Sequence, residues 1–129
     1  MSKLLLDTDV LIDHLRGHRQ LVAEDAAISV VTRAELFAGD ERQEPAIKAL
    51  LGDYDEVDVD WRIAQRAGRV KRLTGLKIAD ALIAATALEH ELPLVTRNRR
   101  HFERVGGLAL RAPEDRAEEA VTRWRRPAG

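Results

Sequence analysis

Three acidic residues stand where a folded chain would bury them at a cost in free energy. Asp7 follows a run of three leucines, Glu35 precedes a short apolar run, and Asp80 interrupts a long run of alanine, leucine and isoleucine. Acidic side chains are seldom buried without a partner, and no lysine or arginine is spaced to neutralise all three. A hard divalent cation prefers oxygen ligands and suits phosphate chemistry. The first hypothesis is therefore a metal-dependent phosphodiesterase.

Asp7 and Asp80 also have structural explanations, which are weaker. Helix capping by Thr8 or Asp9 accounts for Asp9 but leaves Asp7 directly behind an apolar run. Asp80 could interact with the dipole of its helix or pair with Lys77, three residues earlier. Either contact contributes roughly tenths of a kcal/mol, whereas burying an unpaired charge costs several. Metal binding is therefore the better explanation for both aspartates.

Glu35 has a stronger structural explanation. Thr32 and Glu35 have the spacing of a capping box, in which the glutamate reaches back to the backbone amide of the cap residue. Taken alone, that interpretation is preferred. Because the predicted sheet should bring Glu35 and Asp7 to one edge, a functional role becomes equally acceptable, and both interpretations stay open.

A basic segment follows the fourth expected strand. It contains Arg97, Arg99 and Arg100 together with the hydroxyl of Thr96 and the amide of Asn98. Arginine clusters suit phosphate recognition because the guanidinium fork matches phosphate oxygens. A solvated loop in which Asn98 caps a helix explains the same residues equally well. The four histidines show no convincing metal spacing, and phosphate loops, nucleophilic serine motifs and dinucleotide fingerprints are absent.

The elements that must position these residues alternate between strand and helix. Hydrophobic periodicity predicts strands at 3–6, 26–31, 56–59, 94–96 and 108–110. Caps and stops predict helices at 10–16, 21–25, 32–39, 44–51, 61–74, 77–91 and 98–105. Such alternation predicts an α/β fold, a three-layer α/β/α sandwich with a mostly parallel central sheet. Ligands bind outside the carboxyl ends of such strands, so the candidate residues should converge there.

Composition limits the remaining possibilities. A chain of 129 residues fits one domain, and we expect residues 1–112 to form it and residues 113–129 to form a helical tail packed on the domain or on a sister subunit. The absence of cysteine excludes disulfides, thiolate zinc sites and cysteine nucleophiles. No apolar stretch approaches the roughly 18 residues of a membrane span, and the N-terminus lacks a signal-peptide pattern. A cytoplasmic protein is expected.

Charge is distributed unevenly along the chain. Residues 1–60 hold 6 basic and 14 acidic groups, whereas residues 61–129 hold 15 basic and 8 acidic groups. An acidic metal pocket beside a basic track for a polyanion would explain this polarity. A solvated surface with complementary halves explains it too, so charge alone does not choose between them.

Four segments of the chain resemble, in order, the four motifs of the PIN-domain nucleases, and within them the VapC-like toxins of toxin–antitoxin pairs. The segments are Leu4–Ile12, Ser29–Gly39, Ile78–Ala87 and Leu94–Phe102. The resemblance implies an α/β/α sandwich, Mg²⁺ or Mn²⁺ bound by Asp7, Glu35 and Asp80, and endonucleolytic cleavage of RNA. It also implies a homodimer and a small VapB-like antitoxin whose C-terminal segment fills the cleft. Asn98 stands where many relatives have a fourth acid and is a neutral metal ligand at best.

The resemblance also implies a mechanism. Metal held by Asp7 and Asp80 would lower the pKa of a bound water and neutralise the phosphate, while Glu35 orients or deprotonates that water. The expected RNA contacts are Thr8, Thr96, Arg97, Arg99 and Arg100.

Two other functions are arguable from the same residues. A haloacid-dehalogenase-like phosphatase would use Asp7 as nucleophile and Asp9 as its partner, but we place no later lysine and acidic pair. A receiver-like signalling module has a similar size and alternation. Its phosphoacceptor should follow the third strand, where Asp58 does not end a buried apolar run.

Overall fold

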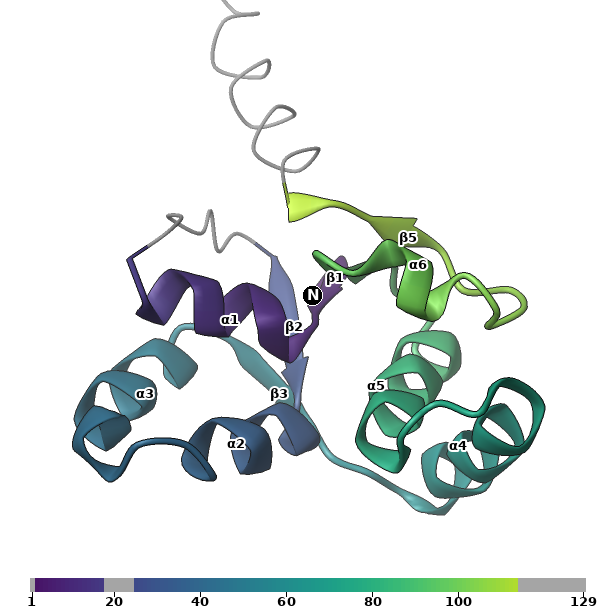
Figure 1. Cartoon of the computed structure of the whole chain (residues 1–129), viewed down its shortest axis with the longest axis horizontal. Coiled ribbons are helices and arrows are strands. Elements are labelled where there is room, and N and C mark those ends of the chain that lie inside the picture. The colour runs from purple at the N-terminus through teal and green to yellow at the C-terminus, as the bar shows by residue number, and fades with distance from the viewer. Residues whose placement is uncertain (1, 18–24, 114–129) are drawn as a thin grey trace, which may run out of the picture.

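A five-stranded parallel sheet forms the centre of the computed structural model, which describes residues 2–17 and 25–113 (Figure 1). The strands are β1 (Leu4–Leu6), β2 (Ala26–Ser29), β3 (Asp55–Val57), β4 (Leu94–Val95) and β5 (Leu110–Arg111). Their order across the sheet is β3-β2-β1-β4-β5, and every neighbouring pair is parallel. The five predicted strands are confirmed, and the third lies at an edge of the sheet.

Helices connect these strands within the described residues. They are α1 (Thr8–Leu15), α2 (Val30–Phe37), α3 (Glu44–Leu51), α4 (Trp61–Thr74), α5 (Ile78–Glu89) and α6 (Arg99–Phe102), with a 3₁₀-helix, η1 (Glu41–Gln43), before α3. In this part of the chain, no helix is long and apolar enough to cross a membrane.

The helices cover both faces of the sheet, and β1 shows how the sequence achieves this. Leu4 and Leu6 lie in a core formed with α1, α2 and α3, whereas Leu5 lies in a second core formed with α4, α5 and α6. Successive strand residues point to opposite faces, and parallel strands that are buried on both faces consist of continuous apolar runs. Figure 1 shows the two groups of helices on either side of the strands. The three-layer sandwich is confirmed.

The longest helix begins and ends where the sequence predicts. Asp60 caps α4, because its Oδ1 accepts a hydrogen bond of 2.9 Å from the amide of Ile63. Gly75 ends it with a φ of 76°, a left-handed conformation that glycine adopts at little cost. The next helix, α5, is less completely buried than expected, because Ile78 is 52% exposed and Asp80 is partly exposed.

Several predicted boundaries are wrong, and two of them affect the site. The first helix begins at Thr8 rather than Val10, with Asp7 as its cap. The second begins at Val30, and the hydroxyl of Ser29 accepts a 3.0 Å hydrogen bond from the amide of Val31. Thr32 therefore lies inside α2 and is not its cap. The helix predicted at 98–105 is shorter, and η1 was not predicted. Residues 18–24 and 114–129, which include most of the helix predicted at 21–25 and of the predicted tail, lie outside the described residues.

Candidate active site

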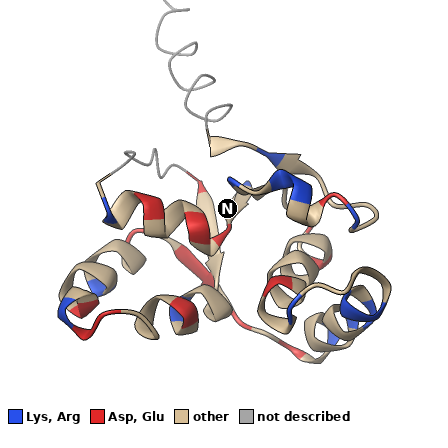
Figure 2. Cartoon of the chain, in the orientation of Figure 1, with Lys and Arg blue, Asp and Glu red and all other residues tan. Residues whose placement is uncertain are grey.

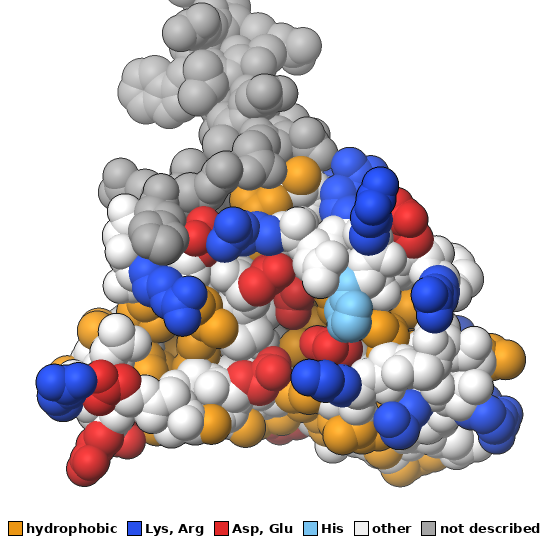
Figure 3. Space-filling model, viewed as in Figure 1, with side chains coloured by type: hydrophobic (Ala, Val, Ile, Leu, Met, Phe, Trp, Pro, Cys, Tyr) orange, Lys and Arg blue, Asp and Glu red, His pale blue; other side chains and the backbone are white. Residues whose placement is uncertain are grey.

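The candidate residues meet at the carboxyl ends of β1, β2 and β4. Leu6 is paired with Val95, so the next residues of the two strands, Asp7 and Thr96, emerge side by side. Acidic positions on α1 and α5 lie on either side of the middle of the view in Figure 2, and basic positions lie on α6 and α4. In the space-filling view, acidic side chains gather at the middle of this face with basic ones around them (Figure 3). The predicted convergence at this edge is confirmed.

Asp7 is the most deeply buried of the three predicted acids, with an exposed fraction of 5%. Its Oδ1 accepts a hydrogen bond of 2.8 Å from the amide of Thr8, and its Oδ2 accepts one of 2.8 Å from the hydroxyl of Thr96. The pKa of Asp7 is raised to about 7, mainly by burial and also by the charges of Asp9 and Asp80, against the opposing effect of the two hydrogen bonds. Among the described residues, the carboxylate form of Asp7 has no positively charged side chain as a partner.

Asp9 is a site residue that the sequence alone did not identify, because helix capping already explained it. The cap is Asp7, and Asp9 lies in the first turn of α1, with its Oδ2 3.4 Å from the hydroxyl of Thr96. That hydroxyl has one hydrogen, which the shorter contact to Asp7 takes. Burial raises the pKa of Asp9 as well, although the amide and the charge of Arg97 oppose the shift.

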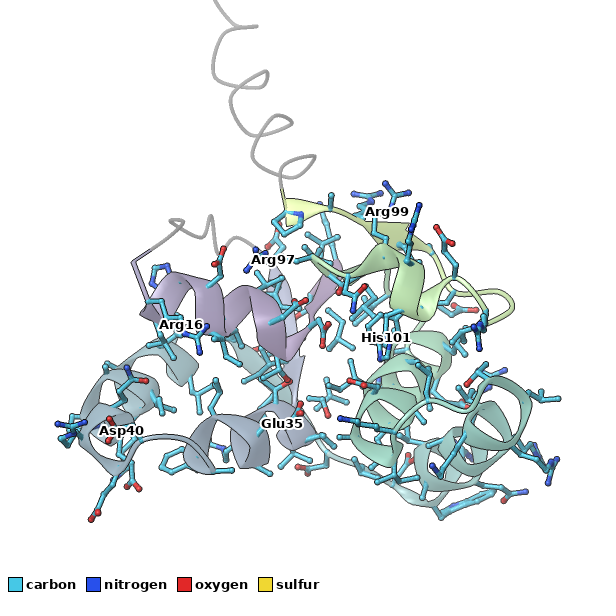
Figure 4. The ribbon with its side chains drawn as sticks, in the orientation of Figure 1. Arg16, Glu35, Asp40, Arg97, Arg99 and His101 are labelled. Atoms are coloured by element: carbon cyan, nitrogen blue, oxygen red, sulfur yellow. The ribbon has the colours of Figure 1, made fainter. Side chains whose placement is uncertain are left out.

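Glu35 also reaches this edge of the sheet, but not as part of a capping box. Its Oε1 accepts a hydrogen bond of 2.6 Å from the hydroxyl of Thr8, which in turn lies 2.9 Å from the hydroxyl of Thr32. Because α2 begins two residues before Thr32, Glu35 cannot serve as the third residue of a box that Thr32 opens. Through Thr8, the side chain of Glu35 is therefore linked to the same site as Asp7, and the residue is exposed to solvent (Figure 4).

Asp80 is held by a histidine. The Oδ2 of Asp80 lies 2.9 Å from Nε2 of His101, and the carboxylate side chain is 23% exposed. The alternative ion pair with Lys77 is not formed among the described residues. Histidine spacing gave no signal for His101, because its partner is 21 residues away in sequence. Figure 4 shows His101 on α6, on the side that faces the middle of the molecule.

In the basic segment, one arginine bonds to another side chain of the protein, and two are exposed to solvent. The guanidinium of Arg97 donates a hydrogen bond of 2.9 Å to Asp13, a buried residue of α1 that the sequence did not single out. Arg99 and Arg100 are exposed on α6. Asn98 is exposed too, and its backbone N–H donates to the hydroxyl of Thr96 at 3.0 Å. The alternative in which Asn98 caps the helix through its side chain is not supported, because Asn98 precedes α6 without a side-chain cap bond.

The donor set agrees chemically with a hard divalent cation. As placed, no three acidic or histidine side chains within residues 2–17 and 25–113 form a group that could hold a metal ion. All four converging acids nevertheless offer oxygen ligands, which Mg²⁺ and Mn²⁺ prefer. The raised pKa of Asp7 reflects buried, mutually repelling carboxylates, and a cation would relieve that repulsion. These residues therefore fit Mg²⁺ or Mn²⁺.

The sheet order argues against one alternative function. Receiver-like modules have the strand order 2-1-3-4-5, whereas the order here is β3-β2-β1-β4-β5. The third strand, which should precede a phosphoacceptor, lies at the edge of the sheet, and Asp58 directly after it is exposed. The receiver alternative is not supported.

Comparisons with known proteins agree with this fold. Residues 4–108 match the PIN domain family model. Ribonuclease VapC1 of Methanocaldococcus jannaschii is 33% identical over 117 residues, which cover 85% of this chain and 86% of that protein. The tRNA(fMet)-specific endonuclease VapC of Shigella flexneri is 31% identical over 126 residues, which cover 84% of this chain and 96% of that protein. A toxin–antitoxin complex from Klebsiella pneumoniae has a TM-score of 0.73 at 31% identity, covering 86% of this chain and 98% of that chain.

These matches include all four segments that carried the resemblance, from Leu4 to Phe102. They give no support to the phosphatase alternative, because both curated relatives are named as enzymes that cleave RNA. The parallel five-stranded sheet, the acids at its carboxyl edge and the family match agree with one another. This chain belongs to the PIN-domain family.

Proposed function

We propose that this protein is an endoribonuclease that depends on Mg²⁺ or Mn²⁺ and acts as the toxin of a toxin–antitoxin pair. One observation carries the proposal: Asp7 is buried with a raised pKa, and Asp9, Glu35 and Asp80 converge beside it. A protein would not keep such a cluster for stability, because mutually repelling buried carboxylates destabilise the fold. The family match and the names of the relatives support cleavage of RNA as the use of this site.

The residues that would hold the metal are Asp7, Asp9 and Asp80, with Glu35 and Asn98 as further oxygen donors. A bound Mg²⁺ or Mn²⁺ would neutralise charge on the scissile phosphate and make a bound water more acidic. Glu35 is suited to accept a proton from the attacking water, because its carboxylate is exposed and one of its oxygens is fixed by Thr8.

RNA binding would fall mainly to the arginines. Arg99 and Arg100 are exposed at the rim, where guanidinium groups can bind backbone phosphates. Arg97 is half exposed, and its guanidinium forms an ion pair with Asp13. Thr8 and Thr96 stay candidate RNA contacts, but both are buried and their hydroxyls already donate to Glu35 and Asp7. We propose that these two threonines mainly orient the acids.

The partners are also proposals. The structural neighbour from Klebsiella pneumoniae is a toxin–antitoxin complex, which supports a VapB-like antitoxin whose C-terminal segment enters the acidic site. An approaching segment with a cationic side chain would supply a positive charge to Asp7, whose described neighbours include no cation. We propose a homodimer on the same basis of family likeness.

The proposal is tested with labelled RNA, including a tRNA fraction, incubated with protein and Mg²⁺, Mn²⁺ or a chelator. Cleavage should require the metal and should disappear in Asp7→Asn. The matched control is Asp40→Asn, since Asp40 is an exposed acid far from the site that pairs with Arg42 (Figure 4). Cleavage that persists in the chelator, or that survives Asp7→Asn, would contradict the proposal. p-Nitrophenyl phosphate and acetyl phosphate, offered in parallel, should be left intact.

A further inference from the structure

We infer that Thr32 is a positioning residue for Glu35 and acts through the hydroxyl of Thr8. The inference rests on the proposed function, in which Glu35 accepts a proton from water. Thr32 is linked to the carboxylate only through Thr8 in these hydrogen bonds: its hydroxyl lies 2.9 Å from that of Thr8, and the hydroxyl of Thr8 lies 2.6 Å from Oε1 of Glu35.

The direction of these hydrogen bonds follows from counting hydrogens. A hydroxyl has one hydrogen to donate, and a carboxylate oxygen can only accept. Thr8 therefore donates its hydrogen to Glu35. In the contact between the two threonines, Thr8 can then only accept, so Thr32 donates. The three side chains form a one-way relay from Thr32 through Thr8 to Glu35, and hydrogen bonds in such a chain strengthen one another.

Thr32 behaves differently from Thr74 and Thr86, two threonines that lie further from the N-termini of their helices. Thr74 and Thr86 donate their hydroxyls to the backbone carbonyl four residues earlier, Val70 and Leu82 respectively, each at 2.7 Å. That local bond is the usual way to satisfy a helical threonine. Thr32 instead reaches from α2 to α1, although it is fully buried. Capping does not explain this, because Ser29 caps α2.

The relay explains how an exposed glutamate can be held in place. A glutamate side chain has three rotatable bonds and loses considerable freedom when fixed. Thr8 is β-branched, buried and stiff about χ1, and a donated hydrogen bond from Thr32 selects the orientation in which its hydroxyl faces Glu35. The same residue donates its amide to Asp7. Thr8 therefore fixes the positions of Glu35 and Asp7 relative to each other, and Thr32 fixes the orientation of the Thr8 hydroxyl.

The test compares Thr32→Val, which keeps the shape but removes the hydroxyl, with Thr32→Ser, which keeps the hydroxyl. In metal-dependent RNA cleavage, Thr32→Val should lower kcat about tenfold with little change in KM, and Thr32→Ser should stay within about twofold of wild type. Thr86→Val is the matched control, since it removes an equally buried hydroxyl that bonds only to the backbone of α5. It should leave kcat unchanged.

A double variant tests whether Thr32 acts through Thr8. Thr8→Val should lower kcat at least as much as Thr32→Val, and combining the two should cause no further loss, because the relay is already broken. Additive losses would overturn the inference. An unchanged kcat in a folded Thr32→Val protein would overturn it as well.

A measurement without metal or RNA keeps the inference separate from the proposed function. Three-bond couplings report the χ1 angle of Thr8, which should occupy a single rotamer in the wild type. It should become averaged in Thr32→Val and return to one rotamer in Thr32→Ser. Averaging in the wild type would overturn the relay, even if no Thr32→Val protein folds. A protein with the expected couplings that cleaves no RNA would instead overturn the proposed function.

Discussion

Carboxylates in two regions of this molecule are treated in opposite ways. On β3, Glu56 accepts three hydrogen bonds from the guanidinium of Arg33, between 2.6 and 3.1 Å. These bonds hold the pKa of Glu56 below its usual value and raise that of Arg33. At the carboxyl edge of the sheet, burial together with the neighbouring charge of Asp9 raises the pKa of Asp7 to about 7. In the first region an arginine pairs with the acid directly, whereas in the second no described lysine or arginine forms an ion pair with Asp7.

The difference is not due to a shortage of arginine. Arg33 and Glu35 are two residues apart on α2, and positions two apart point in very different directions around a helix. Glu35 therefore reaches the acidic site while Arg33 binds Glu56 on the other side. Arg97, whose backbone amide lies 3.4 Å from Oδ1 of Asp9, donates from its guanidinium to Asp13. We propose that the site keeps its acids for an exogenous cation, and each prediction below tests this proposal.

The largest expected effect comes from removing an acid of the site. Asp7→Asn or Asp80→Asn should lower metal-dependent RNA cleavage by roughly a thousandfold or more, because each removes a negative metal ligand. Both proteins should keep their fold by circular dichroism. Cleavage at the wild-type rate by either variant would remove that residue from the site.

Glu35→Gln should have the next largest effect on catalysis. The amide oxygen can still accept from Thr8, so the side chain should keep its place, while its ability to take a proton from water is lost. We expect a loss of roughly a hundredfold or more in kcat with an unchanged melting temperature. Normal turnover in a folded Glu35→Gln protein would show that Glu35 is not the base.

The raised pKa of Asp7 also makes a prediction about stability and pH. In the folded protein the pKa is about 7, above the ordinary value of 3.8. The stabilising contribution of the protonated form is thus fully present below about pH 4 and is lost as the pH rises through 7. Without metal, Asp7→Asn should exceed the wild type at pH 8 by roughly 1–3 kcal/mol in unfolding free energy. Urea unfolding of both proteins at pH 4 and at pH 8 measures this difference in unfolding free energy. A difference that does not change with pH would contradict the prediction.

The smallest effect is expected in the other region of the comparison. Glu56→Gln removes a charge from a partly exposed pair, and such pairs contribute little to stability. The melting temperature should fall by a few degrees at most, and RNA cleavage should be unchanged. A loss of cleavage comparable to that of Asp7→Asn would mean that the two regions are not independent.

Much of the fold could be predicted, because the signals for it are local. The three leucines of β1 and the stop at Gly75 carry their own information. The convergence of Asp7 and Glu35 followed from the rule that ligand sites lie at the carboxyl ends of parallel strands, whereas Asp80, a turn into α5, was placed there only by the direction that its side chain could take. Contacts that depend on side-chain direction could not be predicted. A shift of two residues at the start of α2 turns Thr32 from an expected cap into a buried donor.

Contacts between residues far apart in sequence could not be predicted either. His101 contacts Asp80 across 21 residues, and Arg97 contacts Asp13 across 84. No spacing rule for a helix or a strand connects residues so far apart in sequence. Asp9 was hidden differently, since a capping role was sufficient to explain it until Asp7 proved to be the cap.

Proton release on metal binding tests the central claim most directly, namely that Asp7 is held ready for a cation. Calorimetric titration with Mn²⁺ or Mg²⁺ in buffers of different ionisation enthalpy gives the number of protons released. Since the pKa of Asp7 is raised to about 7, the wild type should release about one proton per site at pH 6 and close to none at pH 8.5. Asp7→Asn should release far fewer at pH 6. Metal binding at pH 6 with no proton release from the wild type would contradict the account.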